Sequence, residues 1–162
     1  ITLGGADPMN LTGVMALKLG MAFPGVDFHI AAGLSFPDID SLKKIEGGNI
    51  HLHINPGMSE LMLKCDAAVS ACGSTVYELC ACGTPAVGIV AADNQKLVAG
   101  WMDSIGALKY AEAPDDIIEH LKSLDYVTRS GMSEIGQSLV DGCGSFRLAG
   151  EIRKIILAGT TT

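Results

Sequence analysis

The residues of this sequence best suited to hold a phosphate are Gly73, Ser74 and Thr75, with Glu78 one turn further on. A glycine lets the backbone approach a ligand, and unpaired amides at a helix start can bind an anion without any Lys or Arg. The same residues also match the T-x-x-E capping box, in which the glutamate bonds back to the threonine amide. The pattern therefore leaves two interpretations open, a phosphate site and a helix cap.

A second candidate is the loop that contains Gly4 and Gly5, directly after the first apolar run. The two glycines let the backbone come close to a ligand, and Asn10 or Thr12 is expected to cap the helix that follows. A Gly-Gly pair is not the spaced dinucleotide fingerprint, so it is a weak signal alone.

The third candidate is a pair of neighbouring amide side chains, Asn94 and Gln95, after another apolar run. Their donors and acceptors suit the hydroxyls of a sugar. An ordinary Asn N-cap explains the same residues equally well.

Short apolar runs alternate with helical patterns along the first hundred residues, and these elements must position the loops. The alternation is typical of βαβ units, so the predicted fold class is α/β, a Rossmann-like doubly wound parallel sheet. In the strand order 3-2-1-4-5 the three loops converge on one crevice at the carboxyl ends of the strands. After Pro114 only helices are predicted, the second of them capped by Asp125. Strands are expected at residues 1–3, 28–32, 50–54, 67–71 and 86–90, with a weaker one near 107–110, and helices at 11–21, 39–45, 58–64, 76–82, 95–102, 115–124, 126–140 and 145–157.

The composition suits one domain with a substantial core, since 48% of the 162 residues are hydrophobic and 18% are charged. The first residue is Ile1, already inside a strand pattern, so we expect a domain cut from a longer protein. The formal net charge is -7 and the eleven Lys and Arg are scattered, which argues against a nucleic-acid partner. Neither a long apolar run nor a signal pattern occurs, so we expect no membrane span and a cytoplasmic location.

Five cysteines, an odd number, are expected to be reduced thiols. Cys80 and Cys82 would lie about 200° apart on a helix, so they cannot chelate one ion together and no metal site is expected. Cys72 could pair with His51 or His53, which share one strand face, as a thiol nucleophile and its base. No third group orients such a pair, so the pattern favours a packed thiol and surface histidines.

Four segments together resemble the C-terminal half of a two-domain, GT-B-type nucleotide-sugar enzyme. The sequence is most similar to the UDP-sugar hydrolase of pseudaminic acid biosynthesis and to its polysaccharide and spore-coat biosynthesis relatives, and more distantly to the MurG-type N-acetylglucosaminyltransferases. The resemblance implies a UDP-sugar ligand, no cofactor, and an N-terminal Rossmann-like domain as partner. The segments are GGADPMNLT at the start, MSELMLKCDAAVSACGSTVYELCACGTPAVGI in the middle, Asn94-Gln95, and DGCGSFR from Asp141 to Arg147.

The resemblance also implies a role for each matching residue. The diphosphate would be held by Gly73, Ser74 and Thr75, and Glu78 would accept hydrogen bonds from the ribose hydroxyls. The sugar would face Asn94 and Gln95, the nucleotide would lie along Gly4 and Gly5, and the Ile54 backbone would contact the base. The family's catalytic base is a His of the N-terminal domain, so this chain is expected to hold no catalytic residue.

The resulting expectation is the UDP-sugar-binding half of a hydrolase that releases UDP from a UDP-linked deoxy amino sugar. Such an enzyme would serve the synthesis of sialic-acid-like sugars (pseudaminic or legionaminic acid) or of surface polysaccharides. A glycosyltransferase, in which an acceptor hydroxyl replaces water, stays open, and so does a non-catalytic sugar-nucleotide sensor or oligomerisation module. The role of Arg147, toward a phosphate or toward the other domain, is also left open.

Overall fold

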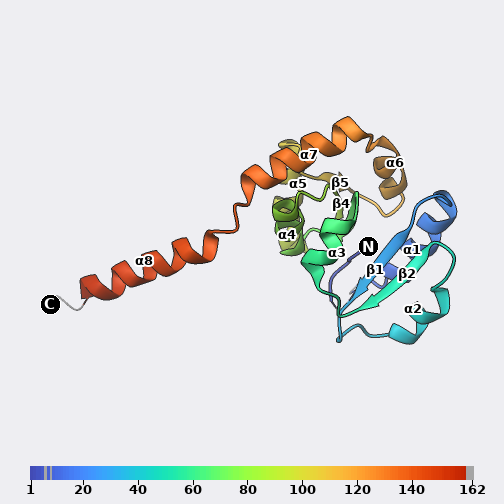
Figure 1. Cartoon of the computed structure of the whole chain (residues 1–162), viewed down its shortest axis with the longest axis horizontal. Helices are drawn as coiled ribbons and strands as arrows, with labels where there is room; N and C mark the ends of the chain where they lie inside the picture. The colour runs from blue at the N-terminus through green and yellow to red at the C-terminus, as the bar shows by residue number, and fades with distance from the viewer. Residues whose placement is uncertain (6, 8, 160–162) are drawn as a thin grey trace.

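The structure, a computed structural model, describes residues 1–5, 7 and 9–159. Parallel strands are flanked by helices on both faces, and the last helix extends away from the body (Figure 1). The strands are β1 (Phe28–Ala32), β2 (Ile50–Ile54), β3 (Ala68–Ala71), β4 (Ala86–Ile89) and β5 (Lys109–Ala111). The helices are α1 (Thr12–Ala22), α2 (Ile39–Ile45), α3 (Met58–Lys64), α4 (Thr75–Cys82), α5 (Lys96–Ser104), preceded by the 3-10 turn η1 (Asp93–Gln95), α6 (Asp116–Ser123), α7 (Tyr126–Leu139) and α8 (Gly144–Gly159).

Two parallel sheets, β1-β2 and β3-β4-β5, are joined by residues 1–3, which lie between β1 and β3. The Thr2 amide donates to the Val69 carbonyl at 2.8 Å, and the Ala31 amide donates to the Ile1 carbonyl at 3.0 Å. With residues 1–3 counted first, the strand order is 3-2-1-4-5-6, which is a doubly wound order. The α/β prediction is thus confirmed, although residues 1–3 form a single bridge, Thr2 to Ser70, rather than a full strand.

Each face of the sheet buries its own apolar cluster. One face packs against α1, α6 and α7 through residues such as Leu19 and Ile117. The other packs against α3, α4 and α5, for example through Leu79 and Met102. Every residue of β4 is buried, which explains why this strand reads as a continuous apolar run.

The start of α1 differs from its prediction. Neither Asn10 nor Thr12 caps the helix; instead the carboxylate of Asp7, only 3% exposed, accepts hydrogen bonds from the amides of Leu11 (3.1 Å) and Thr12 (3.0 Å). Asp7 has a φ of 38°, which folds its carboxylate back over the helix start. The cap of α7 follows the prediction, since Asp125 accepts a hydrogen bond from a backbone amide there.

We expect Asp7→Ala to lower the free energy of unfolding by about 1–2 kcal/mol, because two amides lose their acceptor in a buried place. Asp7→Asn is the matched control, since Asn keeps one acceptor oxygen and tolerates a positive φ. Urea unfolding of the three chains measures the difference. An unchanged midpoint for Asp7→Ala would contradict the capping role.

On each outer strand of the sheet, one backbone amide donates a hydrogen bond to a carboxylate side chain. On β2, the Leu52 amide donates to Glu46 Oε1 at 3.3 Å. On β5, the Tyr110 amide donates to Asp103 Oδ1 at 2.9 Å. A backbone donor that would otherwise attract a further strand is therefore satisfied on each edge.

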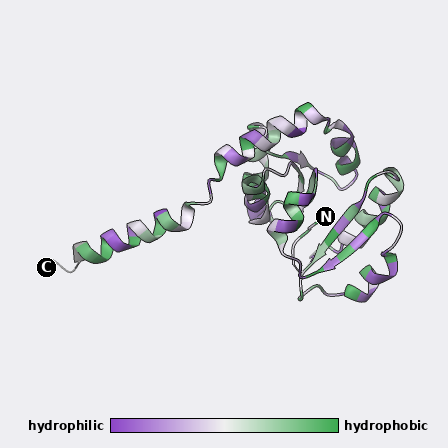
Figure 2. Cartoon of the chain, viewed as in Figure 1, coloured by the Kyte–Doolittle hydropathy of each residue, from purple (hydrophilic) through white to green (hydrophobic). Residues whose placement is uncertain are grey.

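Helix α8 follows a turn at Gly142, whose φ is 71°, and projects from the body (Figure 1). Apolar and polar residues alternate along it (Figure 2), and large apolar side chains such as Phe146 and Ile155 are exposed. Within the part of the chain that the structure describes, no helix is both long and apolar enough to cross a membrane.

Candidate functional site

Every predicted binding residue lies at or after the carboxyl end of a strand or of residues 1–3, so the sheet gathers them along one edge. The loop of Gly4 and Gly5 follows residues 1–3, Ile54 ends β2, and a Cβ placed on Gly33, just after β1, would lie 3.6 Å from the Gly5 Cα. The remaining residues lie in the two loops that follow β3 and β4.

The loop between β3 and α4 presents three unpaired amides. The Cys72 amide donates to the Ile89 carbonyl at 3.0 Å and fixes the end of β3. The Gly73 carbonyl then accepts from the Val76 amide at 3.3 Å, which starts the helical turn. Among the residues that the structure describes, nothing accepts a hydrogen bond from the amides of Gly73, Ser74 or Thr75. These groups, at the positive end of a helix dipole, are suited to an anion.

The capping box, one of the two interpretations left open for this helix, does not form. The N-cap position falls on Ser74, whose backbone is already helical and whose side chain makes no capping bond, so Thr75 lies inside the helix. Glu78 is exposed and forms no hydrogen bond with any described residue. A T-x-x-E capping box requires Thr75 as the N-cap, but the N-cap is the preceding residue, Ser74. The side chains of Thr75 and Glu78 therefore make no capping bond.

The loop after β4 is oriented by Gln95. Its Oε1 accepts a hydrogen bond from the Ala91 amide at 2.8 Å, which fixes the side-chain amide and leaves Nε2 as a donor. A Cβ placed on Gly73 would lie 3.5 Å from this Nε2, so the two loops meet here. Asn94 is exposed within η1 and is not the N-cap of the helix, contrary to the alternative interpretation.

The loop after residues 1–3 offers space, but an Asp carboxylate already bonds to the start of the helix that follows. No described atom lies within 4 Å of a Cβ placed on Gly4 or Gly5, and Gly4 has a φ of 95° that a side chain would disfavour. The amides at the start of α1 already bond to Asp7. A phosphate at this edge would therefore meet a carboxylate bonded to the first amides of α1, whereas no described carboxylate bonds to the first amides of α4.

The loop after β4 also contains an ion pair. Lys96 Nζ lies 2.7 Å from Asp93 Oδ1, and this bond holds the pKa of Asp93 below its ordinary value. Both side chains are exposed. The charges of Lys96 and Asp93 offset each other. An anion at this site would therefore be bound mainly by the backbone amides and by Gln95 Nε2.

Cys72 is a packed thiol rather than a nucleophile. Burial raises the pKa of its thiol to about 11, so it is not a thiolate at neutral pH. Its Sγ would lie 2.5 Å from a Cβ on Gly88, which places it in the core, and no hydrogen bond joins it to a described histidine. The predicted packing role is confirmed.

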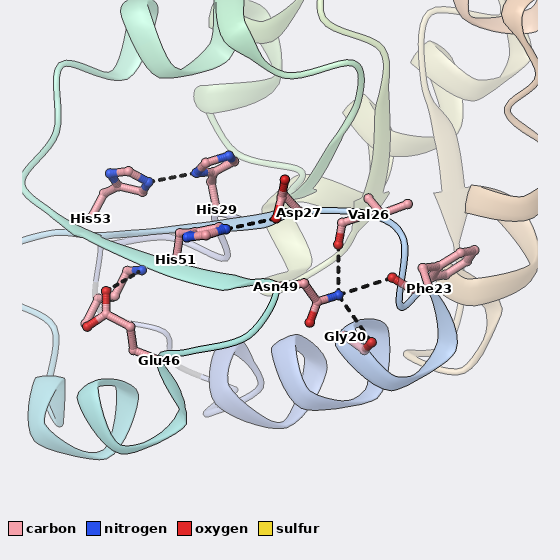
Figure 3. Close-up of polar contacts among 10 residues, drawn as sticks. Gly20, Phe23, Val26, Asp27, His29, Glu46, Asn49, His51 and His53 are labelled. Carbon is pink, nitrogen blue, oxygen red and sulfur yellow. Dashed lines mark hydrogen bonds and ion pairs between the residues drawn. The ribbon is translucent and has the colours of Figure 1, made fainter.

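Three of the four histidines, His29, His51 and His53, form a cluster on one face of β1 and β2 (Figure 3). His29 Nδ1 and His53 Nε2 are 2.8 Å apart, and His51 Nε2 lies 3.0 Å from Asp27 Oδ1. Burial and the neighbouring histidines lower the pKa of His29. His29 had no sequence motif, but the parallel register that pairs it with His51 would have revealed the cluster.

Arg147, whose role the sequence leaves open, bonds within its own segment. Its Nη1 donates to Asp141 Oδ2 at 2.5 Å, on the far side of the Gly142 turn. Among the described residues, no group of three His, Cys, Asp or Glu side chains is placed to hold a metal ion. No protein-family model matches the chain, and none of the curated proteins compared with it is significantly similar.

Proposed function

We propose that this chain is the C-terminal, UDP-sugar-binding half of a two-domain GT-B-type enzyme that releases UDP from a UDP-linked deoxy amino sugar. The supporting observation is the meeting of two loops at the carboxyl edge of the sheet. One loop offers the unpaired amides of Gly73, Ser74 and Thr75, and the other offers the fixed Nε2 donor of Gln95. The enzyme would serve the synthesis of sialic-acid-like sugars or of surface polysaccharides. We place it in the cytoplasm, a reducing compartment in which its cysteines stay free.

The binding mode follows from the donors. A diphosphate seated on the start of α4 receives backbone hydrogen bonds and the positive end of the helix dipole. The same donors stabilise the charge that develops on the leaving UDP. Glu78, exposed one turn into α4, accepts from the ribose hydroxyls, and Asn94 and Gln95 face the sugar. The attacking water is activated by a base from the N-terminal domain, so this chain alone binds and does not turn over.

The proposal is tested by calorimetry of the chain with UDP, UDP-N-acetylhexosamine and uridine, each at millimolar concentration. We expect UDP and the UDP-sugar to bind and uridine, which lacks phosphate, to bind far more weakly. Equal binding of uridine and UDP would contradict a diphosphate site at α4. Absence of binding for all three would contradict the proposed function.

Glu78→Gln should weaken UDP binding by roughly 1.5–3 kcal/mol, because a charge-assisted hydrogen bond to ribose is lost. Since the Glu78 side chain is exposed and unbonded, unfolding should change only by the few tenths of a kcal/mol expected from the helix dipole. Glu134→Gln is the charge-matched control on α7, next to Ser133, which packs near Gly83 at the other end of α4. Equal loss of UDP affinity in both variants would refute the ribose contact.

A further inference from the structure

A cavity lies at the opposite, amino-terminal edge of the sheet. It has a volume of about 480 Å³. Phe28 and His29 of β1 line it on one side, and Ala68 and Val69 of β3 on the other, with Ile1 between them. Figure 1 shows the N-terminus between the two sheets. The cavity is thus a slot in line with residues 1–3.

On the β1 side of the slot, the His29 amide has no described acceptor. Successive amides of a strand point to opposite neighbours. The Phe28 amide donates toward β2, to the Asn49 carbonyl, and the Ala31 amide donates toward residues 1–3, to the Ile1 carbonyl. The His29 amide therefore points into the slot. In this register, its acceptor is the carbonyl of a residue two positions before Ile1.

On the β3 side, the Val69 amide is left open in the same way. The Ala68 amide donates toward β4, to the Pro85 carbonyl at 2.8 Å, and the Ala71 amide donates to the Thr2 carbonyl at 3.1 Å. The Val69 amide thus points into the slot, in a residue that is only 3% exposed. Its acceptor in this register is the carbonyl of the residue directly before Ile1. Buried amides without partners are rare in folded proteins.

Apolar side chains line part of both walls of the slot, alongside charged side chains such as Asp66 and Arg129. One wall contains Phe23, Leu121 and Leu124. A small adjoining cavity on the other wall is lined by Met58 and Met62, among others. Side chains that alternate between the two faces of a strand would therefore each have apolar side chains to pack against.

We propose that this slot holds two residues of extended, apolar polypeptide that continue residues 1–3 as a parallel strand between β1 and β3. Their carbonyls accept from the amides of His29 and Val69, and the two sheets become one. The Ile1 nitrogen already donates to the His29 carbonyl at 2.6 Å, as the amide of a continuing strand does. The inference concerns the opposite edge of the sheet and is independent of the proposed UDP-sugar site.

The test compares three chains, each released from a cleavable N-terminal fusion: one that begins at Ile1, one preceded by Val-Val and one preceded by Asp-Gly. Both extensions move the terminal amine by the same distance, and they differ in the charge, apolar character and strand propensity of the two added residues. We expect Val-Val to raise the Tm by about 5 °C over Asp-Gly. Amide exchange at His29 and Val69 should be slowed by Val-Val alone.

Equal Tm values for the two extended chains would overturn the proposal. So would unchanged exchange at His29 and Val69, because a strand in register must protect both amides. Higher stability with protected amides in the Val-Val chain supports it.

The pH dependence of the Ile1 chain checks that its amine lies in the slot. Burial lowers the pKa of this amine from 8.0 to about 6. Between these values the unfolded chain binds more protons, so the Tm should rise as the pH increases from 6 to 8. In both extended chains this rise should be smaller, whereas an equal rise in all three chains would contradict the burial. The other titratable groups that line the slot are Asp27, His29, Lys64, Cys65, Asp66 and Arg129.

Discussion

Gly88→Ala is expected to lower the free energy of unfolding by about 1–3 kcal/mol, the range for overpacking a filled core. The added methyl would lie 2.5 Å from Cys72 Sγ and 2.9 Å from the Leu108 methyl groups. Gly88 belongs to β4, where every residue is buried, so the backbone has little room to yield.

Cys72→Ala provides the matched control, because it removes the sulfur that the new methyl meets. Combined with Gly88→Ala, it should restore part of the lost stability, so the double variant is more stable than the sum of the single effects predicts. Chemical denaturation of the four chains gives the coupling. Strict additivity would mean that the Cys72 thiol is not what excludes a side chain at position 88.

Gln95→Glu is expected to reduce UDP-sugar affinity by about 100-fold or more, since it removes the Nε2 donor and places a negative charge beside a diphosphate. Stability should hardly change, because the glutamate still offers an oxygen to the Ala91 amide. Gln95→Leu should show the opposite balance. It leaves the Ala91 amide without an acceptor, at a cost of about 1–3 kcal/mol in stability, but it adds no charge to the site.

The two variants are compared by calorimetry with UDP-N-acetylhexosamine and by thermal unfolding. The proposed roles require that Glu be the weaker binder and Leu the less stable protein. If the order of affinity is reversed, the diphosphate does not lie near Gln95. If the order of stability is reversed, the Ala91 bond is not what orients this loop.

The apolar runs predicted β1 to β4 to within one residue, because strands covered on both faces are mostly apolar, although β1 and β2 also carry histidines. The strand order followed from general rules for such sheets. What the pattern could not supply was the register of individual helix starts. At α4 the first turn begins at Gly73, so the residues that match a capping box do not form one. At α1 the cap is Asp7, which lies further before the helix than the N-cap position that the sequence rules consider.

Contacts between distant residues were also beyond the sequence pattern. The approach of Gln95 to Gly73 was predicted only as convergence on one edge, without a contact. The pairing of His29 with His53 depends on the register of β1 against β2. Asn49 is a further example: its Nδ2 donates to the carbonyls of Gly20, Phe23 and Val26 and ties β2 to the end of α1 (Figure 3).

The carboxylates that bond to the outer strands make these edges less suited to pairing with another strand. Glu46 and Asp103 each satisfy a donor that a foreign chain would need, so stacking of molecules edge to edge is discouraged. The open donors, His29 and Val69, lie in the middle instead. The proposed strand would complete the sheet at its centre, whereas the two outer strands discourage the addition of a foreign strand.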